Sequence, residues 1–413
     1  NAIGIDPSVG ALKSYLTQVK QGKNPRVNNM IKSLNFQYTG PIDGHHLSGL
    51  IRELQHLKKQ KGARFLHVIT TKGKGLKQAE ENQVVYHAPG RFDKITGELV
   101  HNTEHKKIKY QDVFGLTLLE LARKNPKIVA ITPAMPTGSS LKYMMDEFPD
   151  RAIDVGIAEQ HAVTLAAGIA LSGCTVFCTV YSTFLQRAYD QVIHDVALQN
   201  VPVILCIDRA GLVGEDGATH QGVFDIAYLN AIPNMTILAP KDAVELRQTL
   251  YSLQNHCESP VAVRYPRGFS NTEHWQIPFE KLDFNKIQEI KKGTKIAVFS
   301  TGTILENVMN ALEFDQGNIA VFHFLQIKPL DKHQILSIAQ EFQTIVTIEE
   351  GVITGGFGSS ITQLLSKNGW NKKIINLGVP DAFIEHATVH EQMEECGLDA
   401  ISLQNLFKNL SNV

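Results

Sequence analysis

The 413-residue chain carries 40 Lys and Arg against 41 Asp and Glu, a net charge of −1, and 43% of its residues are hydrophobic. These are values of a globular protein with two or three domains, and they exclude extended disorder. Balanced charge argues against a protein that coats nucleic acid or an anionic membrane. No run of about eighteen apolar residues occurs, so the sequence predicts no membrane-spanning segment.

Short β-branched runs alternate with stretches of helical spacing. Strands are predicted at Phe65–Thr70, Ile128–Thr132, Thr175–Val180, Val203–Ile207, Thr236–Leu238, Ala262–Tyr265, Ile296–Ser300, Ile319–Phe324, Ile345–Ile348 and Ile374–Leu377. Helices are predicted at Asp112–Arg123, Glu159–Leu171, Leu185–Leu198, Ala243–Leu253 and Ser359–Leu365. Continuous apolar strands that alternate with helices of about ten to fifteen residues predict an α/β fold with parallel sheets covered on both faces.

Two polar stretches interrupt this alternation, one from about Lys77 to Lys109 and one from Asn271 to Gly293. We expect domain boundaries there, which divide the chain into residues 1–107, 108–280 and 281–413.

The five cysteines form neither a disulfide framework nor a zinc motif. They are few and odd in number, and we expect buried thiols in a reducing compartment. They are Cys174, Cys178, Cys206, Cys257 and Cys396.

Glu159 is the first candidate for catalysis. It lies in the string Asp154–His161 (DVGIAEQH), at a predicted junction between a strand and a helix. A carboxylate there is stabilised by the helix dipole, but ligands of open α/β sheets also bind at this edge. From the residues alone, both interpretations stay open.

Three further strings follow predicted strands directly. Tyr181–Gln191 (YSTFLQRAYDQ) crowds aromatic and charged residues together. Asp208–Gly222 (DRAGLVGEDGATHQG) has a glycine-rich backbone that can approach a ligand closely, with a solvated surface loop as the alternative. Arg264 and Arg267 suit the recognition of a phosphate group. Together these strand ends predict one pocket for an anionic ligand.

Glycine-rich turns elsewhere carry weaker signals. Gly40–His45 and Lys72–Gly75 follow apolar segments near the start of the chain. Gly351–Gly358 opens a predicted helix, so it either cradles an anion or allows close packing of helix on sheet.

In order along the chain, these strings resemble the 1-deoxy-D-xylulose-5-phosphate synthase family of transketolase-like thiamine diphosphate enzymes. The resemblance runs over the whole chain, and the Asp208–Gly222 loop separates this family from ordinary transketolases. The strings that carry it are Gly40–His45 (GPIDGH), Tyr86–Ala88 (YHA), Asp154–Val163 (DVGIAEQHAV), Tyr181–Gln191, Asp208–Gly222, Val263–Gly268 (VRYPRG) and Asn376–Asp381 (NLGVPD).

The resemblance implies an activity and its cofactors. Such an enzyme decarboxylates pyruvate and condenses the remaining two carbons with D-glyceraldehyde 3-phosphate. It gives 1-deoxy-D-xylulose 5-phosphate for isoprenoid, thiamine and pyridoxal synthesis, and it uses thiamine diphosphate and Mg²⁺. The resemblance also implies a homodimer in a bacterial cytoplasm or a plastid, with no nucleic-acid or membrane partner.

Roles for single residues follow from the same resemblance. Glu159 matches the carboxylate that activates the cofactor, and Phe184 matches the residue that stacks on its aminopyrimidine ring. Further cofactor contacts fall on Arg187 and on Leu76, where relatives often carry Tyr. The implied contacts to the acceptor substrate are Tyr181, Arg209 and Arg267. The polar residues expected to handle protons are His87, Asp216 and His220.

The metal-binding part of the family pattern is incomplete in this sequence. No Gly-Asp-Gly string occurs, and Asn1 matches the metal-binding Asn that follows it in the family. The segment Gln21–Asn29 is also shorter than usual for the family. We therefore expect residues 1–107 to be the remnant of a diphosphate-binding domain, followed by a pyrimidine-binding domain and a transketolase C-terminal domain.

Two other functions are compatible with these strings. One is a β-type half of a 2-oxo-acid dehydrogenase that works with a separate α chain, although residues 1–107 would then be superfluous. The other is an inactive truncated paralogue that binds and regulates a full-length partner.

Overall fold

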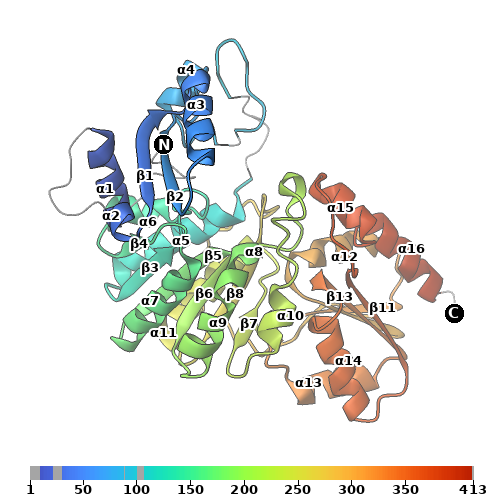
Figure 1. Cartoon of the computed structure of the whole chain (residues 1–413). Coiled ribbons are helices and arrows are strands. Elements are labelled where there is room, and N and C mark those ends of the chain that lie inside the picture. Colours follow the sequence, from blue (N-terminus) through green and yellow to red (C-terminus); the bar gives the residue numbers. More distant parts are fainter. Residues whose placement is uncertain (1–9, 22–29, 88, 100–106, 412–413) are drawn as a thin grey trace. The chain divides into compact units, whose positions relative to one another are not determined.

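The computed structural model describes residues 10–21, 30–87, 89–99 and 107–411. It divides into two compact units, Asn1–Glu104 and His105–Val413 (Figure 1). No helix in the described residues is long and apolar enough to cross a membrane.

The first unit contains a two-stranded parallel sheet whose strands are joined through a helix. Its elements are α1 (Gly10–Lys20), α2 (Met30–Ser33), β1 (Gln37–Asp43), α3 (Leu47–Lys58), β2 (Arg64–Ile69) and α4 (Lys77–Glu81). The predicted strand at Phe65–Thr70 is confirmed as β2. The sequence did not predict β1, because Gly40 and Pro41 interrupt it and both residues are depleted in strands.

The second unit contains two sheets. The larger has seven strands in the order β12-β7-β8-β6-β5-β3-β4, all parallel except β12. Its strands are β3 (Ile128–Thr132), β4 (Ala152–Asp154), β5 (Thr175–Tyr181), β6 (Val203–Ala210), β7 (Thr236–Leu238), β8 (Val261–Pro266) and β12 (Gln326–Lys328). The first helices are α5 (Tyr110–Lys124), α6 (Lys142–Glu147) and α7 (Glu159–Leu171). The later ones are α10 (Asp225–Asn230) and α11 (Ala243–His256).

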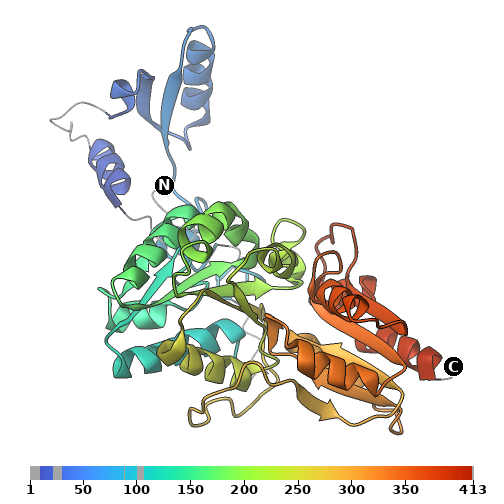
Figure 2. The same cartoon turned by 90° about the horizontal axis from the view of Figure 1, so that it is seen from below.

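Alternation along β5 sends side chains to both faces of this sheet. Val176, Cys178 and Val180 pack with apolar residues of α7, while Phe177 packs with residues of α5 and α11. Figure 2 shows helices above and below the sheet. The predicted α/β class with parallel strands covered on both faces is confirmed.

The smaller sheet has five strands in the order β14-β13-β10-β11-β9, with only β9 antiparallel. Its strands are β9 (Gln288–Lys291), β10 (Ile296–Ser300), β11 (Ile319–His323), β13 (Thr344–Val352) and β14 (Lys373–Val379). Its helices are α12 (Leu305–Ala311), α13 (Lys332–Gln340), α14 (Phe357–Lys367), α15 (Val389–Glu395) and α16 (Ala400–Ser411). The segment after residue 281 thus builds its own sheet and also lends β12 to the larger one.

One predicted helix, Leu185–Leu198, is instead a chain of short turns. It consists of α8 (Ser182–Leu185), a 3-10 turn (Gln186–Ala188), α9 (Tyr189–Gln191) and a π-helical stretch (Val192–Ala197). Apolar periodicity predicts helical structure here but not the change in hydrogen-bond register, which is frequent at functional sites.

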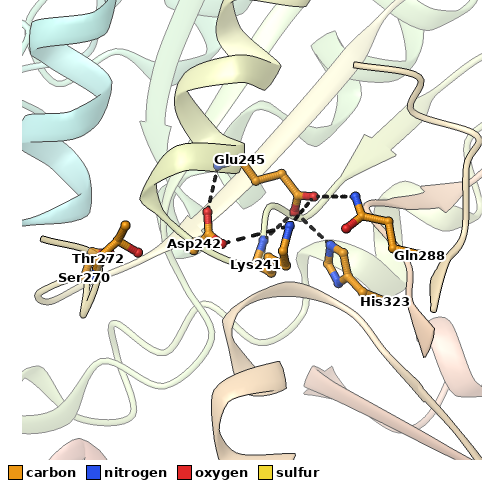
Figure 3. A network of polar contacts seen from close by, with 7 residues as sticks. All are labelled: Lys241, Asp242, Glu245, Ser270, Thr272, Gln288 and His323. Carbon is orange, nitrogen blue, oxygen red and sulfur yellow. Dashed lines mark hydrogen bonds and ion pairs between the residues drawn. The ribbon is translucent and has the colours of Figure 1, made fainter. Parts of the chain in front are cut away.

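A buried polar network joins α11 to the smaller sheet (Figure 3). Glu245 Oε2 accepts a hydrogen bond from His323 Nε2 at 2.8 Å, and its Oε1 accepts from Gln288 at 3.1 Å and from Lys241 Nζ at 2.9 Å. Only 3% of the Glu245 surface is exposed. This buried carboxylate therefore links the half of the second unit built on the larger sheet to the half built on the smaller sheet.

Candidate active site

The four strings predicted to form one pocket lie where strands of the seven-stranded sheet end. Strands β4, β5, β6 and β8 end at Asp154, Tyr181, Ala210 and Pro266. Because these strands are parallel, their carboxyl ends lie along one edge, which is where open α/β sheets bind ligands.

Glu159 is the first residue of α7 and is 6% exposed. The turn before it is built on Asp154, whose Oδ1 accepts hydrogen bonds from the backbone N–H of Ala134 at 2.8 Å and of Gly156 at 2.9 Å. Glu159 Oε1 accepts a hydrogen bond from Arg187 Nη1 at 2.9 Å. Two predicted cofactor residues are therefore an ion pair.

Aromatic and cationic side chains form a continuous row beside this pair. The rings of Tyr181 and Phe184 are stacked with centroids 5.9 Å apart. Arg209 lies over the Tyr181 ring, with its guanidinium carbon 4.3 Å from the ring centroid. His220 meets Phe184 edge-on at 5.5 Å, and Arg187 lies 5.4 Å from the Phe184 centroid. Burial raises the pKa of Tyr181, so its hydroxyl stays a neutral hydrogen-bond donor.

The glycine-rich string forms a loop from Gly211 to Gly222, called here the 211–222 loop. These two glycines exchange backbone hydrogen bonds of 2.7 and 2.8 Å, which close it. A Cβ at Gly222 would lie 2.0 Å from the Arg209 carbonyl oxygen, so only glycine fits. At its base the buried Asp208 pairs with Arg209 Nη1 at 2.5 Å. Burial raises the pKa of Asp208, and the guanidinium opposes that rise.

Arg267, after β8, reaches the same loop. Its Nη1 lies 3.0 Å from Asp216 Oδ2 and 3.3 Å from Glu215 Oε2, and it donates to the Val213 carbonyl oxygen at 2.6 Å. The structure thus brings Arg267 and Asp216 together, as the sequence predicted for residues of one site.

Arg264, the other arginine of this string, has a different role. It is 4% exposed, and it donates to Asp225 from Nε at 3.2 Å and to the Glu350 carbonyl oxygen at 3.1 Å. Arg264 is therefore a buried residue that links β8 to α10 and β13, and it is not part of an anion site. The sequence hides this because Asp225 lies 39 residues away.

The Gly351–Gly358 string also binds a group of the chain itself. The N–H groups of Phe357 and Gly358, at the start of α14, donate to the two carboxylate oxygens of Glu349 at 2.8 Å each. The chain's own buried carboxylate therefore occupies the place where the sequence allowed an external anion.

Two further predicted residues belong to the first unit. Leu76 precedes α4 and is half-buried, and His87 lies in an exposed turn of the first unit. Asn1 falls outside the described residues. In the described part of the chain, no group of three or more His, Cys, Asp or Glu side chains could hold a metal ion.

Gly138, in the turn after β3, lies against Tyr181, and no sequence pattern pointed to it. A Cβ there would lie 2.3 Å from the Tyr181 hydroxyl and 2.4 Å from Met135 Cε. We expect Gly138→Ala to displace the Tyr181 ring and to cost about 1–3 kcal/mol of stability, as overpacking does, which thermal unfolding would measure. Gly168→Ala on α7 is the control, because apart from its chain neighbours and the backbone of its own helix no atom lies within 4 Å of that Cβ. If the two variants unfold at the same temperature, Gly138 does not hold Tyr181 in place.

Comparison with known proteins decides the family. Family models match residues 13–70 (1-deoxy-D-xylulose-5-phosphate synthase), 106–271 (transketolase, pyrimidine binding domain) and 285–403 (transketolase, C-terminal domain). A 1-deoxy-D-xylulose-5-phosphate synthase of Cytophaga hutchinsonii is 42% identical over 100% of this chain and 72% of its own length. The chain belongs to the 1-deoxy-D-xylulose-5-phosphate synthase family.

Other synthases agree with this assignment. Those of Parabacteroides distasonis and Bacteroides thetaiotaomicron are 45% and 47% identical, over 96% and 91% of this chain. The chain spans 62% and 59% of their lengths. The family is transketolase-like and depends on thiamine diphosphate. The match at residues 13–70 favours a synthase over the β-type half of a dehydrogenase.

Solved structures show the same architecture. A split-gene transketolase, described as an inactive beta4 tetramer, superposes with a TM-score of 0.65 at 26% identity over 73% of this chain and 98% of its own. A transketolase mutant from Pichia stipitis superposes with a TM-score of 0.59 at 15% identity, over 75% of this chain and 46% of its own. The latter likeness concerns the fold alone.

Proposed function

We propose that the polypeptide carrying this chain is a 1-deoxy-D-xylulose-5-phosphate synthase, a transferase of the transketolase type. It would take pyruvate and D-glyceraldehyde 3-phosphate and release carbon dioxide and 1-deoxy-D-xylulose 5-phosphate. The observation that carries the proposal is the gathering of Glu159, Phe184, Tyr181 and Arg209 at one sheet edge in a chain of this family.

The residues at this edge fit the aminopyrimidine end of thiamine diphosphate. Glu159 is buried, and among the described residues Arg187 alone donates a hydrogen bond to its carboxylate, at Oε1, which leaves Oε2 for another donor. Phe184 is half-buried and offers an aromatic face beside it. Glu159 would hold the aminopyrimidine ring by a hydrogen bond, and Phe184 would stack on it, with Arg187 and Leu76 as further contacts.

When bound, thiamine diphosphate supplies a thiazolium carbon that acts as a nucleophile on 2-oxo acids. The chain's own residues would bind and orient the substrates. Arg209 and Arg267 would hold the phosphate of the acceptor, for which guanidinium groups are well suited, and the neutral Tyr181 hydroxyl would donate to it. Asp216, His220 and His87 would move protons at the substrate oxygens.

Other parts of the proposal rest on the resemblance. We propose domain boundaries at residues 1–107, 108–280 and 281–413, a homodimer as the working unit, and a bacterial cytoplasmic location. Mg²⁺ would bind with the diphosphate, with Asn1, which lies outside the described residues, as one ligand.

The test measures carbon dioxide release from pyruvate and the appearance of the sugar phosphate, using the intact polypeptide with thiamine diphosphate and Mg²⁺. We expect the sugar phosphate only when D-glyceraldehyde 3-phosphate is present. We also expect a saturating concentration of this aldehyde to stimulate carbon dioxide release strongly. A dehydrogenase half would need a separate α chain and would form no sugar phosphate. An inactive paralogue would release no carbon dioxide, and either result would refute the proposal.

Arg267→Met tests the phosphate contact. Losing a charge-assisted hydrogen bond worth about 1.5–3 kcal/mol should raise KM for D-glyceraldehyde 3-phosphate about 10- to 100-fold. D-Glyceraldehyde, which lacks the phosphate, should be used as well by the variant as by the wild type. Arg123→Met is the matched control, since Arg123 pairs with Glu147 at 2.6 Å on the surface and touches no site residue. An equal loss with both aldehydes would mean that Arg267 does not read the phosphate.

A further inference from the structure

Gln392, on α15, binds the 211–222 loop from the opposite half of the second unit. Its Oε1 accepts a hydrogen bond from the Gly214 N–H at 2.8 Å, and its Nε2 donates to the Gly214 carbonyl oxygen at 3.0 Å. Nε2 also donates to the Glu385 carbonyl oxygen at 2.7 Å. Gln392 is 0% exposed, so both donors and the acceptor of its amide are used inside the protein.

A second glutamine supports the same contact. Gln221, which is 5% exposed, accepts from the Val213 N–H at 2.8 Å and donates to the Ile384 carbonyl oxygen at 3.3 Å. The two backbones also approach closely, because a Cβ at Gly217 would lie 2.9 Å from His386 Cβ. The loop therefore lies directly on the segment from Ile384 to α15.

The contact is made next to the residues proposed to bind the acceptor. Gly214 opens the 3-10 turn that ends at Asp216, and the preceding carbonyl, that of Val213, accepts a hydrogen bond from Arg267. Asp216 completes the ion pair with Arg267 at 3.0 Å. A change in the backbone at Gly214 would thus shift the Val213 carbonyl oxygen and Asp216, the two loop groups that contact Arg267.

The loop needs such a contact because its own sequence gives it little rigidity. Glycines occupy positions 211, 214, 217 and 222, and glycine loses more conformational freedom on folding than any other residue. The bridge between Gly211 and Gly222 fixes only the ends of the loop. The middle is held by Arg267, which contacts Val213 and Asp216, and by Gln392, which contacts Gly214.

We propose that Gln392 is a positioning residue for the acceptor substrate. Through Gly214 it holds the 211–222 loop so that Asp216 and Arg267 meet the phosphorylated aldehyde, and it contacts neither substrate nor cofactor itself. The identity of the substrate in this role rests on the proposed function, whereas the effect of Gln392 on the loop does not depend on it.

Gln248 on α11 offers a matched control. It is 3% exposed, donates from Nε2 to the Pro278 carbonyl oxygen at 2.8 Å and accepts at Oε1 from the Glu280 N–H at 2.8 Å. It therefore makes the same kind of amide clamp on another segment, and none of its contacts is a predicted site residue. Gln392→Leu and Gln248→Leu should lose similar stability.

Two measurements on the intact polypeptide test separately whether Gln392 holds the loop and whether it affects substrate binding. Amide hydrogen exchange of the peptide spanning residues 211–222 should speed up at least about tenfold in Gln392→Leu and stay unchanged in Gln248→Leu. Calorimetric titration with D-glyceraldehyde 3-phosphate should give a Kd raised about tenfold in Gln392→Leu alone, as expected for misplaced binding groups.

Each outcome decides a separate claim. Unchanged exchange in Gln392→Leu would overturn the clamp. Faster exchange with an unchanged Kd would overturn the positioning role. If the wild type binds no D-glyceraldehyde 3-phosphate, the proposed function fails and with it the role toward that substrate, while the exchange rates still decide whether Gln392 holds the loop.

Discussion

Glu159→Gln should lower carbon dioxide release from pyruvate by about 10²–10⁴-fold, the range typical of a lost acid–base group. The amide keeps the shape of the side chain but removes the negative charge, which would favour protonation of the cofactor's aminopyrimidine ring. Stability should change little, because the side chain of Arg187 is 57% exposed and water can replace its partner. Initial rates and thermal unfolding of the same preparations would check both expectations.

Glu147→Gln is the control for this variant. Glu147 also pairs with an arginine, Arg123, at 2.6 Å, but it lies on α6 and contacts no site residue. The rate of carbon dioxide release by Glu147→Gln should stay within about twofold of the wild-type rate, as expected for a surface substitution. Equal rates for Glu159→Gln and the wild type would show that this carboxylate does not activate the cofactor.

The location of the site could be predicted from the sequence because of one topological fact. Parallel strands end at a shared edge, so strings that follow strands Thr175–Val180 and Val203–Ile207 had to converge if the strands were neighbours. The structure makes β5 and β6 neighbours, and Tyr181, Phe184 and Arg209 do meet.

What could not be predicted depends on partners distant in sequence. Arg264 and Arg267 look alike in the string VRYPRG, yet one is buried against Asp225 and the other reaches Asp216. Gln392 carries no motif at all, since its role arises from a loop 178 residues away. Local patterns record periodicity and turn chemistry, whereas these pairings depend on which segments, distant in sequence, the fold brings side by side.

The network around Glu245 predicts a loss of stability in acid. Burial alone would raise the pKa of Glu245, but the hydrogen bond from His323 and the charge of Lys241 outweigh it and lower the pKa from 4.5 to about 2. Because the folded-state pKa lies below the unfolded one, the carboxylate stabilises the fold above pH 4.5. This contribution, about 3 kcal/mol at about 1.4 kcal/mol per pKa unit, is lost as the pH falls from about 4.5 toward 2.

Glu245→Gln should therefore be less stable than the wild type by about 3 kcal/mol at pH 7, and the difference should shrink to near zero at about pH 2. Denaturant unfolding of both proteins at a series of pH values would measure this convergence. Asp146→Asn, which breaks the exposed pair with Lys142, should cost at most about 0.5 kcal/mol at any pH. A constant difference between Glu245→Gln and the wild type from pH 7 to pH 2 would mean that the loss comes from packing. In that case the charge of Glu245 would not tie α11 to the smaller sheet.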